Sequence, residues 1–159
     1  MKVKILNENT AGKRGFLAEH GLSLLIETGG KRWLFDTGQT DVFLKNAEHL
    51  SEDLLHLDGI ILSHGHFDHC GGLEYLVRLY EERKQKLPPV YVRENAFLNK
   101  TAINGDGCTY RMIGIPWKRE LLGASIRVTE PCQEISQGVF VLGNIPYTSP
   151  FEKKPGWFS

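Results

Sequence analysis

The sequence has 159 residues, and its 19 basic and 19 acidic side chains balance to a formal charge of zero. A hydrophobic content of 41% with this low net charge excludes an intrinsically disordered chain. No apolar run approaches the ~20 residues that a membrane helix needs, and balanced charge argues against a nucleic-acid partner bound through phosphates. We therefore expect one globular domain over residues 1–159, with neither a membrane nor a nucleic acid as its partner.

The expected compartment is the cytoplasm. The N-terminal segment becomes polar too early for the apolar region of a signal peptide. Three cysteines, Cys70, Cys108 and Cys132, are an odd and widely spaced set, which does not indicate a disulfide framework. Reduced thiols in a cytoplasmic protein are the simplest interpretation.

The first third of the chain predicts strands followed by a helix. Val3 and Ile5, with Leu6 as a further candidate, form an apolar stripe that indicates a short first strand. Residues 22–28 and 31–36 form two further strands around a Gly-Gly hairpin turn. Thr40 or Asp41 is then placed to cap a helix that carries apolar residues at helical spacing.

The remaining pattern predicts an α/β layered domain. A strand over 58–63 precedes a helix from about 72 to 86, which Pro88-Pro89 ends, and a parallel strand over 90–92 follows. Two last strands are predicted over 126–128 and 139–142, joined by a turn around 136–138. Strands that alternate with helices are typical of α/β layers.

The informative segment lies directly after the strand over 58–63. Three of the six histidines fall within it, as His64, His66 and His69, together with Asp68. If the chain stays extended there, His64, His66 and Asp68 project to one side, and His69 lies at the turn into the next helix. Imidazole and carboxylate are ligands of Zn²⁺, Mn²⁺ and Fe²⁺, so the segment predicts a metal site.

The motif His64-x-His66-x-Asp68-His69 is similar to the signature of the metallo-β-lactamase superfamily of metal-dependent hydrolases. Residues 34–38, which end in Asp-Thr-Gly, resemble a strand end of the same family. Residues 19–28 resemble a subgroup related to a pterin ribofuranosyl-aminobenzene phosphate synthase. The resemblance implies an αββα sandwich, of which this chain matches the N-terminal αβ half.

The resemblance also implies roles for individual residues. His64 and His66 would bind one metal, and Asp68 and His69 a second, with Zn²⁺ expected before Mn²⁺ or Fe²⁺. A hydroxide between the metals would attack an ester or a phosphate-containing small molecule, and Asp68 would also orient this nucleophile. Asp36 resembles a residue that fixes a histidine ring from outside the metal shell; its alternative role is to cap the following helix.

The sequence departs from the family in its ligand count. Two metals need about six ligands, the motif supplies four, and no histidine follows His69 to supply the family's later ones. The chain is therefore expected to be the N-terminal part of a hydrolase, one subunit of a split enzyme, or a non-catalytic metal-binding or interaction module. In the first two cases we expect association with a copy of itself or with a complementary C-terminal half, because a lone half exposes its apolar sheet face.

Two neighbours of the motif have open roles. Cys70 is expected to be a packed residue at a helix start, with a redox-sensitive neighbour of the metal as the alternative. His20 is expected to be a partly buried or surface histidine, and a place near the mouth of the site is its alternative.

Overall fold

A computed structural model describes residues 1–146, 148–149 and 151 and contains one six-stranded sheet in the order β1-β2-β3-β4-β5-β8. The first three strands are antiparallel, whereas β3, β4, β5 and β8 run parallel. The strands are β1 (Lys2–Asn7), β2 (Ser23–Thr28), β3 (Lys31–Phe35), β4 (Gly59–Ile61), β5 (Val90–Val92) and β8 (Ile126–Val128).

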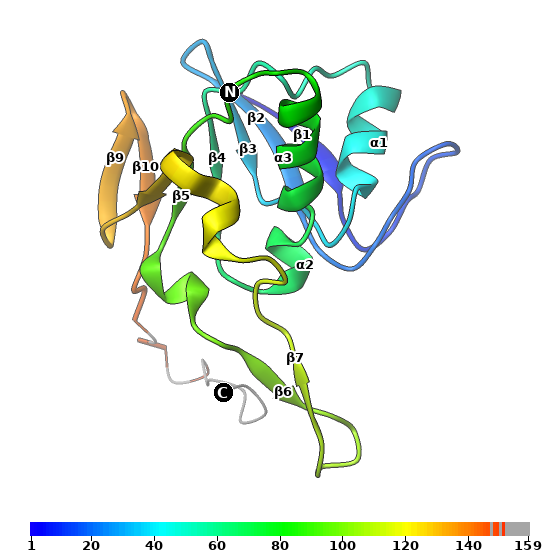
Figure 1. Cartoon of the computed structure of the whole chain (residues 1–159), viewed down its shortest axis with the longest axis vertical. Helices are drawn as coiled ribbons and strands as arrows, with labels where there is room; N and C mark the ends of the chain where they lie inside the picture. The colour runs from blue at the N-terminus through cyan, green and yellow to red at the C-terminus, as the bar shows by residue number, and fades with distance from the viewer. Residues whose placement is uncertain (147, 150, 152–159) are drawn as a thin grey trace.

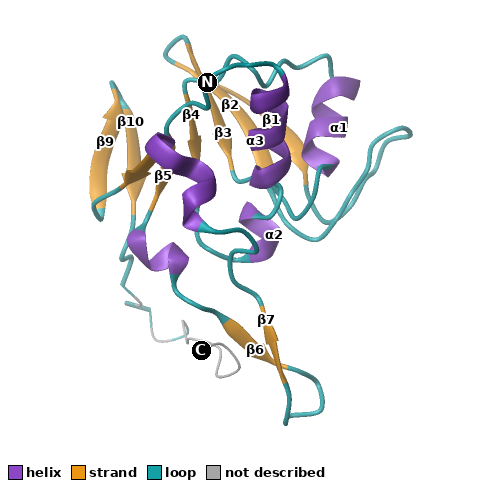
Figure 2. Cartoon of the chain, viewed as in Figure 1, coloured by secondary structure: helices purple, strands orange, loops and turns teal. Residues whose placement is uncertain are grey.

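The helices α1 (Val42–His49) and α3 (Leu73–Glu82) cover one face of this sheet, and the short α2 (Phe67–Cys70) lies beyond the strand ends (Figure 1; Figure 2). Two 3-10 segments follow, η1 (Glu94–Phe97) and η2 (Arg119–Ser125). The apolar side chains of β1 to β5 that face α1 and α3 form one core with them, including Leu25, Leu34 and Ile60 from the strands and Phe43 and Leu76 from the helices. All five of these side chains are fully buried.

The opposite face of the sheet is apolar and partly open. Val3 and Ile5 on the edge strand β1 are 47% and 58% exposed, whereas Leu6 next to them is buried on the helix side. Along the same open face, Leu24, Ile26, Phe35 and Ile61 are half-buried. Trp33 is buried there beside Tyr91. The apolar stripe predicted for the first strand therefore points away from the helices.

Two hairpins lie outside the main sheet. β9 (Cys132–Ser136) pairs with β10 (Val139–Leu142), and β6 (Thr101–Ile103) pairs with β7 (Tyr110–Met112), which extends away from the sheet in Figure 1. The strands predicted over 126–128 and 139–142 are both present, but the turn around 136–138 joins β9 to β10 rather than β8 to β10, and β8 pairs with β5 in the main sheet. β9 is polar, so the sequence did not predict it as a strand.

The helix limits also differ from the prediction. α3 ends at Glu82, with Arg83 as its C-cap, and Lys84 already has a φ of 53°. The helix therefore stops before Pro88-Pro89 rather than at it. Asp41 precedes α1 as predicted, but its side chain makes no capping hydrogen bond. Within the described part of the chain, no helix has the length and apolar character needed to cross a membrane.

The core position of Phe43 gives a direct test of this fold. The ring is 0% exposed between α1 and the sheet, so Phe43→Ala leaves a cavity and should lower the free energy of unfolding by about 3–5 kcal/mol. Phe140→Ala is the matched control, since this ring is 58% exposed and its loss should change stability by no more than about 0.5 kcal/mol. Urea unfolding followed by circular dichroism measures both; equal losses would contradict the packing described.

Candidate metal centre

The predicted ligands lie where two parallel strands end. β3 ends at Phe35 and β4 at Ile61, and the amide of Asp36 donates to the carbonyl of Ile61 over 2.9 Å. The segments that follow both strands therefore meet at one edge of the sheet, next to α2 (Figure 1). The carboxyl ends of parallel strands are the usual place for a ligand site in such sheets.

Asp36 is the buried centre of this region. Its side chain is 0% exposed and its backbone has a φ of 55°, a conformation in which Asp is tolerated more readily than most residues. Oδ1 accepts from the Ser63 amide at 2.7 Å, and Oδ2 accepts from the Ser63 hydroxyl at 2.6 Å and from His69 Nδ1 at 2.8 Å. His69 therefore carries its proton on Nδ1, which leaves Nε2 available to a cation.

Asp36 does not act as the capping residue of α1. The amides of Gln39 and Thr40, just before that helix, both donate to Glu19 Oε1 at 2.8 Å. The capping alternative considered for Asp36 is therefore wrong in the structure, where the carboxylate holds Ser63 and His69 instead.

Ser63 was not predicted as part of the site, although it directly precedes the first histidine. Its hydroxyl donates to Asp36, so it can accept the Nδ1 proton of His64, which lies 2.9 Å away. His64 Nε2 then accepts a hydrogen bond from His66 Nδ1 at 3.0 Å. Two nitrogen ligands of one tetrahedral zinc are about 3.3 Å apart, so this pair could hold a cation that replaces the shared proton.

Asp68 and His69 form a second pair; His69 lies at a helical turn as predicted, but Asp68 is not in the extended conformation that was predicted for it. The chain is extended only as far as His66, whose φ and ψ are −92° and 149°, and Asp68 and His69 lie on α2. Asp68 Oδ2 is 3.6 Å from His69 Nε2, and the His64 and His69 rings are 4.2 Å apart. The structure thus gathers all four predicted ligands, although the extended-chain reason given for it is wrong.

The four side chains form two pairs rather than one closed set. Among the residues that the structure describes, no three His, Cys, Asp or Glu side chains are arranged as a complete cation site. The chemistry of the donors, imidazole nitrogens with assigned protons and a carboxylate, fits zinc or a similar divalent metal. Each pair could supply two ligands, and further ligands would have to come from elsewhere.

Burial and the charge of Asp36 shift the pKa values of the three histidines in different directions. Burial lowers the pKa of His64 to about 4, and burial also lowers the pKa of His66. Burial acts in the same direction on His69, but the hydrogen bond and the negative charge of Asp36 outweigh it and raise the pKa of that ring. His64 and His66 are therefore neutral at pH 7, the form that binds a metal.

Backbone packing holds the motif in place. A side chain at Gly65 would put its Cβ 1.9 Å from the carbonyl oxygen of Ala96, so only glycine allows this close approach to η1. The amide of Phe67 donates to the carbonyl of Ile113 at 3.0 Å. The turn that carries His64 and His66 is therefore fixed by segments that follow it in the chain.

Cys70 is a packed residue, as expected. Its side chain is 0% exposed, and its thiol donates to the carbonyl of His66 at 2.7 Å. Burial raises the pKa of the Cys70 thiol, which suppresses the reactive thiolate. The redox-sensitive alternative therefore finds no support in the structure.

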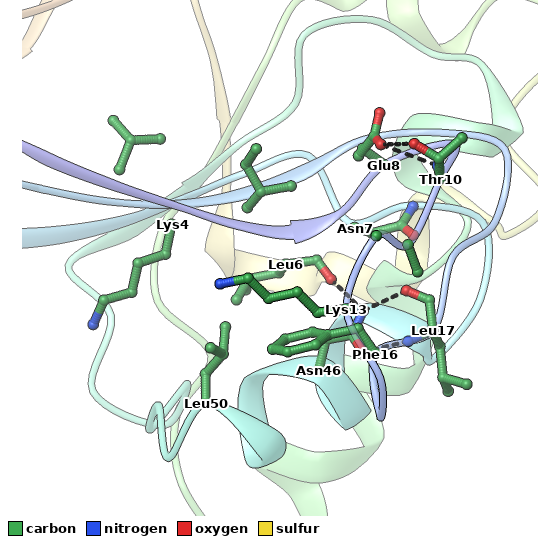
Figure 3. Close-up of a pocket in the computed structure, with 14 residues that line it drawn as sticks. Lys4, Leu6, Asn7, Glu8, Thr10, Lys13, Phe16, Leu17, Asn46 and Leu50 are labelled. Atoms are coloured by element: carbon green, nitrogen blue, oxygen red, sulfur yellow. Dashed lines mark hydrogen bonds between the residues drawn. The ribbon is translucent and has the colours of Figure 1, made fainter.

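A separate hollow of about 490 Å³ lies between β1, the loop that follows it and α1 (Figure 3). The Asn46 amide donates to the carbonyls of Leu6 and Leu17, at 2.7 and 2.9 Å, and so ties the loop to the edge strand. None of the four predicted metal ligands lines this hollow. It is therefore distinct from the candidate metal centre.

The depressed pKa of His64 predicts how stability depends on pH in the metal-free protein. The folded pKa of about 4 lies below the unfolded value of 6.5, so this group's contribution is present above pH 6.5 and is lost as pH falls towards 4. His64→Gln should therefore reduce the loss of stability between pH 6.5 and 4. Thermal unfolding in a chelating buffer measures the slope; an unchanged slope would show that His64 is not held neutral by burial.

Comparison with known proteins places this site in a family. Residues 18–94 match the metallo-beta-lactamase superfamily. An uncharacterized protein of Methanocaldococcus jannaschii is 37% identical over 153 residues, which cover 94% of this chain and 56% of that protein. The 7,8-dihydropterin-6-methyl-4-(beta-D-ribofuranosyl)-aminobenzene-5'-phosphate synthase of the same organism is 32% identical over 165 residues, which cover 98% of this chain and 55% of that enzyme.

A solved structure agrees with these matches. The crystal structure of a metal-dependent hydrolase of the beta-lactamase superfamily superimposes with a TM-score of 0.67 and 34% sequence identity, covering 89% of this chain and 47% of that chain. The α/β fold of the metallo-β-lactamase type is therefore confirmed. The chain spans about half the length of each of these three relatives.

Proposed function

Because the chain belongs to the metallo-β-lactamase superfamily, we propose that it carries the metal-binding segment of a hydrolase that acts on an ester or a phosphate-containing small molecule. The observation that supports this most directly is the pair His64 Nε2 and His66 Nδ1, 3.0 Å apart and backed by Ser63 and Asp36. Such a pair is suited to a divalent cation and lies at the ligand-binding edge of the sheet.

The two donor pairs receive different roles in the proposal. His64 and His66 would hold one cation, and Asp68 and His69 a second, with Zn²⁺ favoured and Mn²⁺ or Fe²⁺ as alternatives. When bound, these cations supply Lewis acidity, which polarises the scissile bond and lowers the pKa of water towards ~7.

Residues of the chain itself orient the ligands and the attacking water. Asp36 and Ser63 fix the ring orientation of His69 and His64, which limits the rearrangement of these two rings when a cation binds. The side chain of Asp68 remains 13% exposed and is proposed to accept a hydrogen bond from the attacking water and thereby to orient it.

A phosphate-containing substrate is favoured over a lactam by the relatives. One of the two M. jannaschii proteins is named as a synthase of an aminobenzene 5'-phosphate compound. That name describes the relative, and the substrate class is carried to this chain as part of the proposal.

The two ligand pairs are incomplete, so the remaining ligands must be supplied from elsewhere. No histidine follows His69, and among the described residues no three candidate donors converge on one point. We propose that the remaining ligands come from a further α/β layer packed on the open sheet face, so that the 159-residue chain by itself hydrolyses substrate weakly. A non-catalytic metal-binding module is the second candidate, and the same incomplete pairs favour it.

Metal titration followed by an activity assay tests the function. The chain should bind Zn²⁺, and His66→Ala should weaken binding at least tenfold because it removes half of a donor pair. His56→Ala is the control, since this exposed histidine pairs with Asp53 away from the cluster. Calorimetry measures the affinity, and absence of Zn²⁺ binding would refute the proposal.

The activity assay separates the two candidates. With excess Zn²⁺ or Mn²⁺, cleavage of bis-p-nitrophenyl phosphate by the chain alone should stay well below the ~1–10³ s⁻¹ typical of enzymes. Turnover in that range would show that the chain needs no further ligands. No turnover with any ester or phosphate probe, even in the presence of a complementary chain, would favour the module.

The open sheet face predicts self-association of the isolated chain. Ile5 is 58% exposed beside the half-buried Ile26 and Leu24, so a second copy can bury this surface in place of the proposed further layer. Ile5→Lys should shift the particle mass towards that of a monomer, whereas Leu98→Lys, at a site 65% exposed elsewhere, should not. Light scattering coupled to gel filtration measures the mass; a wild-type monomer at all concentrations would contradict the prediction.

A further inference from the structure

His20 reaches the metal centre from a distant part of the sequence. Its Nε2 lies 3.2 Å from Asp68 Oδ2, and its Nδ1 lies 3.1 Å from Asn9 Oδ1. The side chain is 73% exposed, as expected for a surface histidine. Its contact with Asp68 also places it near the candidate site, which was the alternative considered for it.

The segment that carries His20 is fastened on one side by Glu19. The Glu19 carboxylate accepts the amides of Gln39 and Thr40 at 2.8 Å and the Thr40 hydroxyl at 2.6 Å. These groups follow the Asp36-Thr37-Gly38 turn directly. The backbone next to His20 is therefore tied to the same turn that positions Asp36.

The end of β1 fastens the segment on its other side. Asn7 Oδ1 accepts the amide of Glu19 at 3.3 Å, and Asn9 Oδ1 accepts the amide of Gly21 at 3.1 Å. Gly21 has a φ of 132°, and a Cβ on it would lie 1.9 Å from the carbonyl oxygen of Asp68. The backbone at Gly21 thus touches Asp68 directly, which places the neighbouring imidazole beside the same residue.

Asn9 and Asp68 both present oxygen atoms to the His20 ring. The Gly21 amide can only donate, so the Asn9 atom that it meets, which also lies 3.1 Å from His20 Nδ1, is the carbonyl oxygen. The ring therefore lies between two acceptors, and it donates to Asn9 and to Asp68 at once only when both of its nitrogens carry protons. Asp36 and His69 form the same kind of pair, in which a neighbour outside the metal shell fixes a ligand.

We propose that His20 is a positioning residue that holds the Asp68 carboxylate in its cation-binding orientation. This inference rests on the proposed function, because it assigns Asp68 to a cation. Outer partners of this kind typically change metal affinity 10–100-fold when they are removed. The effect should be confined to the cation that depends on Asp68.

Cobalt binding tests the proposal through a double-mutant cycle. Co²⁺ affinity and the visible absorption of the bound ion are measured for wild type, His20→Ala, Asp68→Asn and the double variant. We expect His20→Ala to weaken Co²⁺ binding about 10–100-fold and to change the absorption spectrum, with no further effect in the Asp68→Asn background. His20→Gln, which keeps an N–H donor, should recover part of the loss.

His56→Ala is the matched control, because His56 is also 73% exposed and also paired with an aspartate, Asp53. Equal Co²⁺ affinity in His20→Ala and His56→Ala would overturn the positioning role alone. The same holds if His20→Ala lowers the Co²⁺ affinity as much in the Asp68→Asn background as in the wild type. Absence of Co²⁺ binding to the wild-type chain would instead refute the proposed function together with this inference. Thermal unfolding of each variant shows whether a loss of affinity reflects unfolding.

Discussion

The organisation of the candidate metal centre depends on one buried carboxylate. Asp36 is 0% exposed, yet it is fully engaged by the amide and hydroxyl of Ser63 and by His69 Nδ1. A buried carboxylate is costly unless hydrogen bonds satisfy it, so these donors cannot be moved without a penalty. The same bonds that stabilise the charge also fix the proton positions of His69 and, through Ser63, of His64.

The sheet makes this arrangement possible. Asp36 and Ser63 follow adjacent parallel strands, and the core between the sheet and the helices keeps those strands in register. α2 then places His69 next to the Asp36 carboxylate. The site is therefore assembled from two strand ends and one short helix, each positioned by packing that lies outside it.

Sequence spacing named four candidate ligands, which the structure places near one another, but it did not give their geometry. The motif from His64 to His69 is local, and its residue types alone point to a metal. Its backbone was predicted to stay extended as far as Asp68, because an alternation of period two fits the spacing, but Asp68 lies with His69 on a single helical turn. A turn this short has too few residues for a helical period to be visible.

Other features depend on contacts between distant segments. His20 and Asn9 carry no local signal for their contact with Asp68, which arises from the path of the loop after β1. The strand β9 is polar and shows no apolar alternation, so it was not predicted, and its pairing with β10 was missed. The parallel strand over 90–92, by contrast, was confirmed, because a helix must cross over between two parallel strands.

X-ray absorption spectroscopy at the zinc edge, on the chain loaded with one equivalent of Zn²⁺, tests the central claim most directly. The account predicts imidazole scattering in the shell, with nitrogen at about 2.0–2.1 Å, that diminishes in His64→Ala and in His66→Ala. A shell without imidazole, or one dominated by sulfur at about 2.3 Å from the cysteines, would contradict the assignment of this segment as the metal centre.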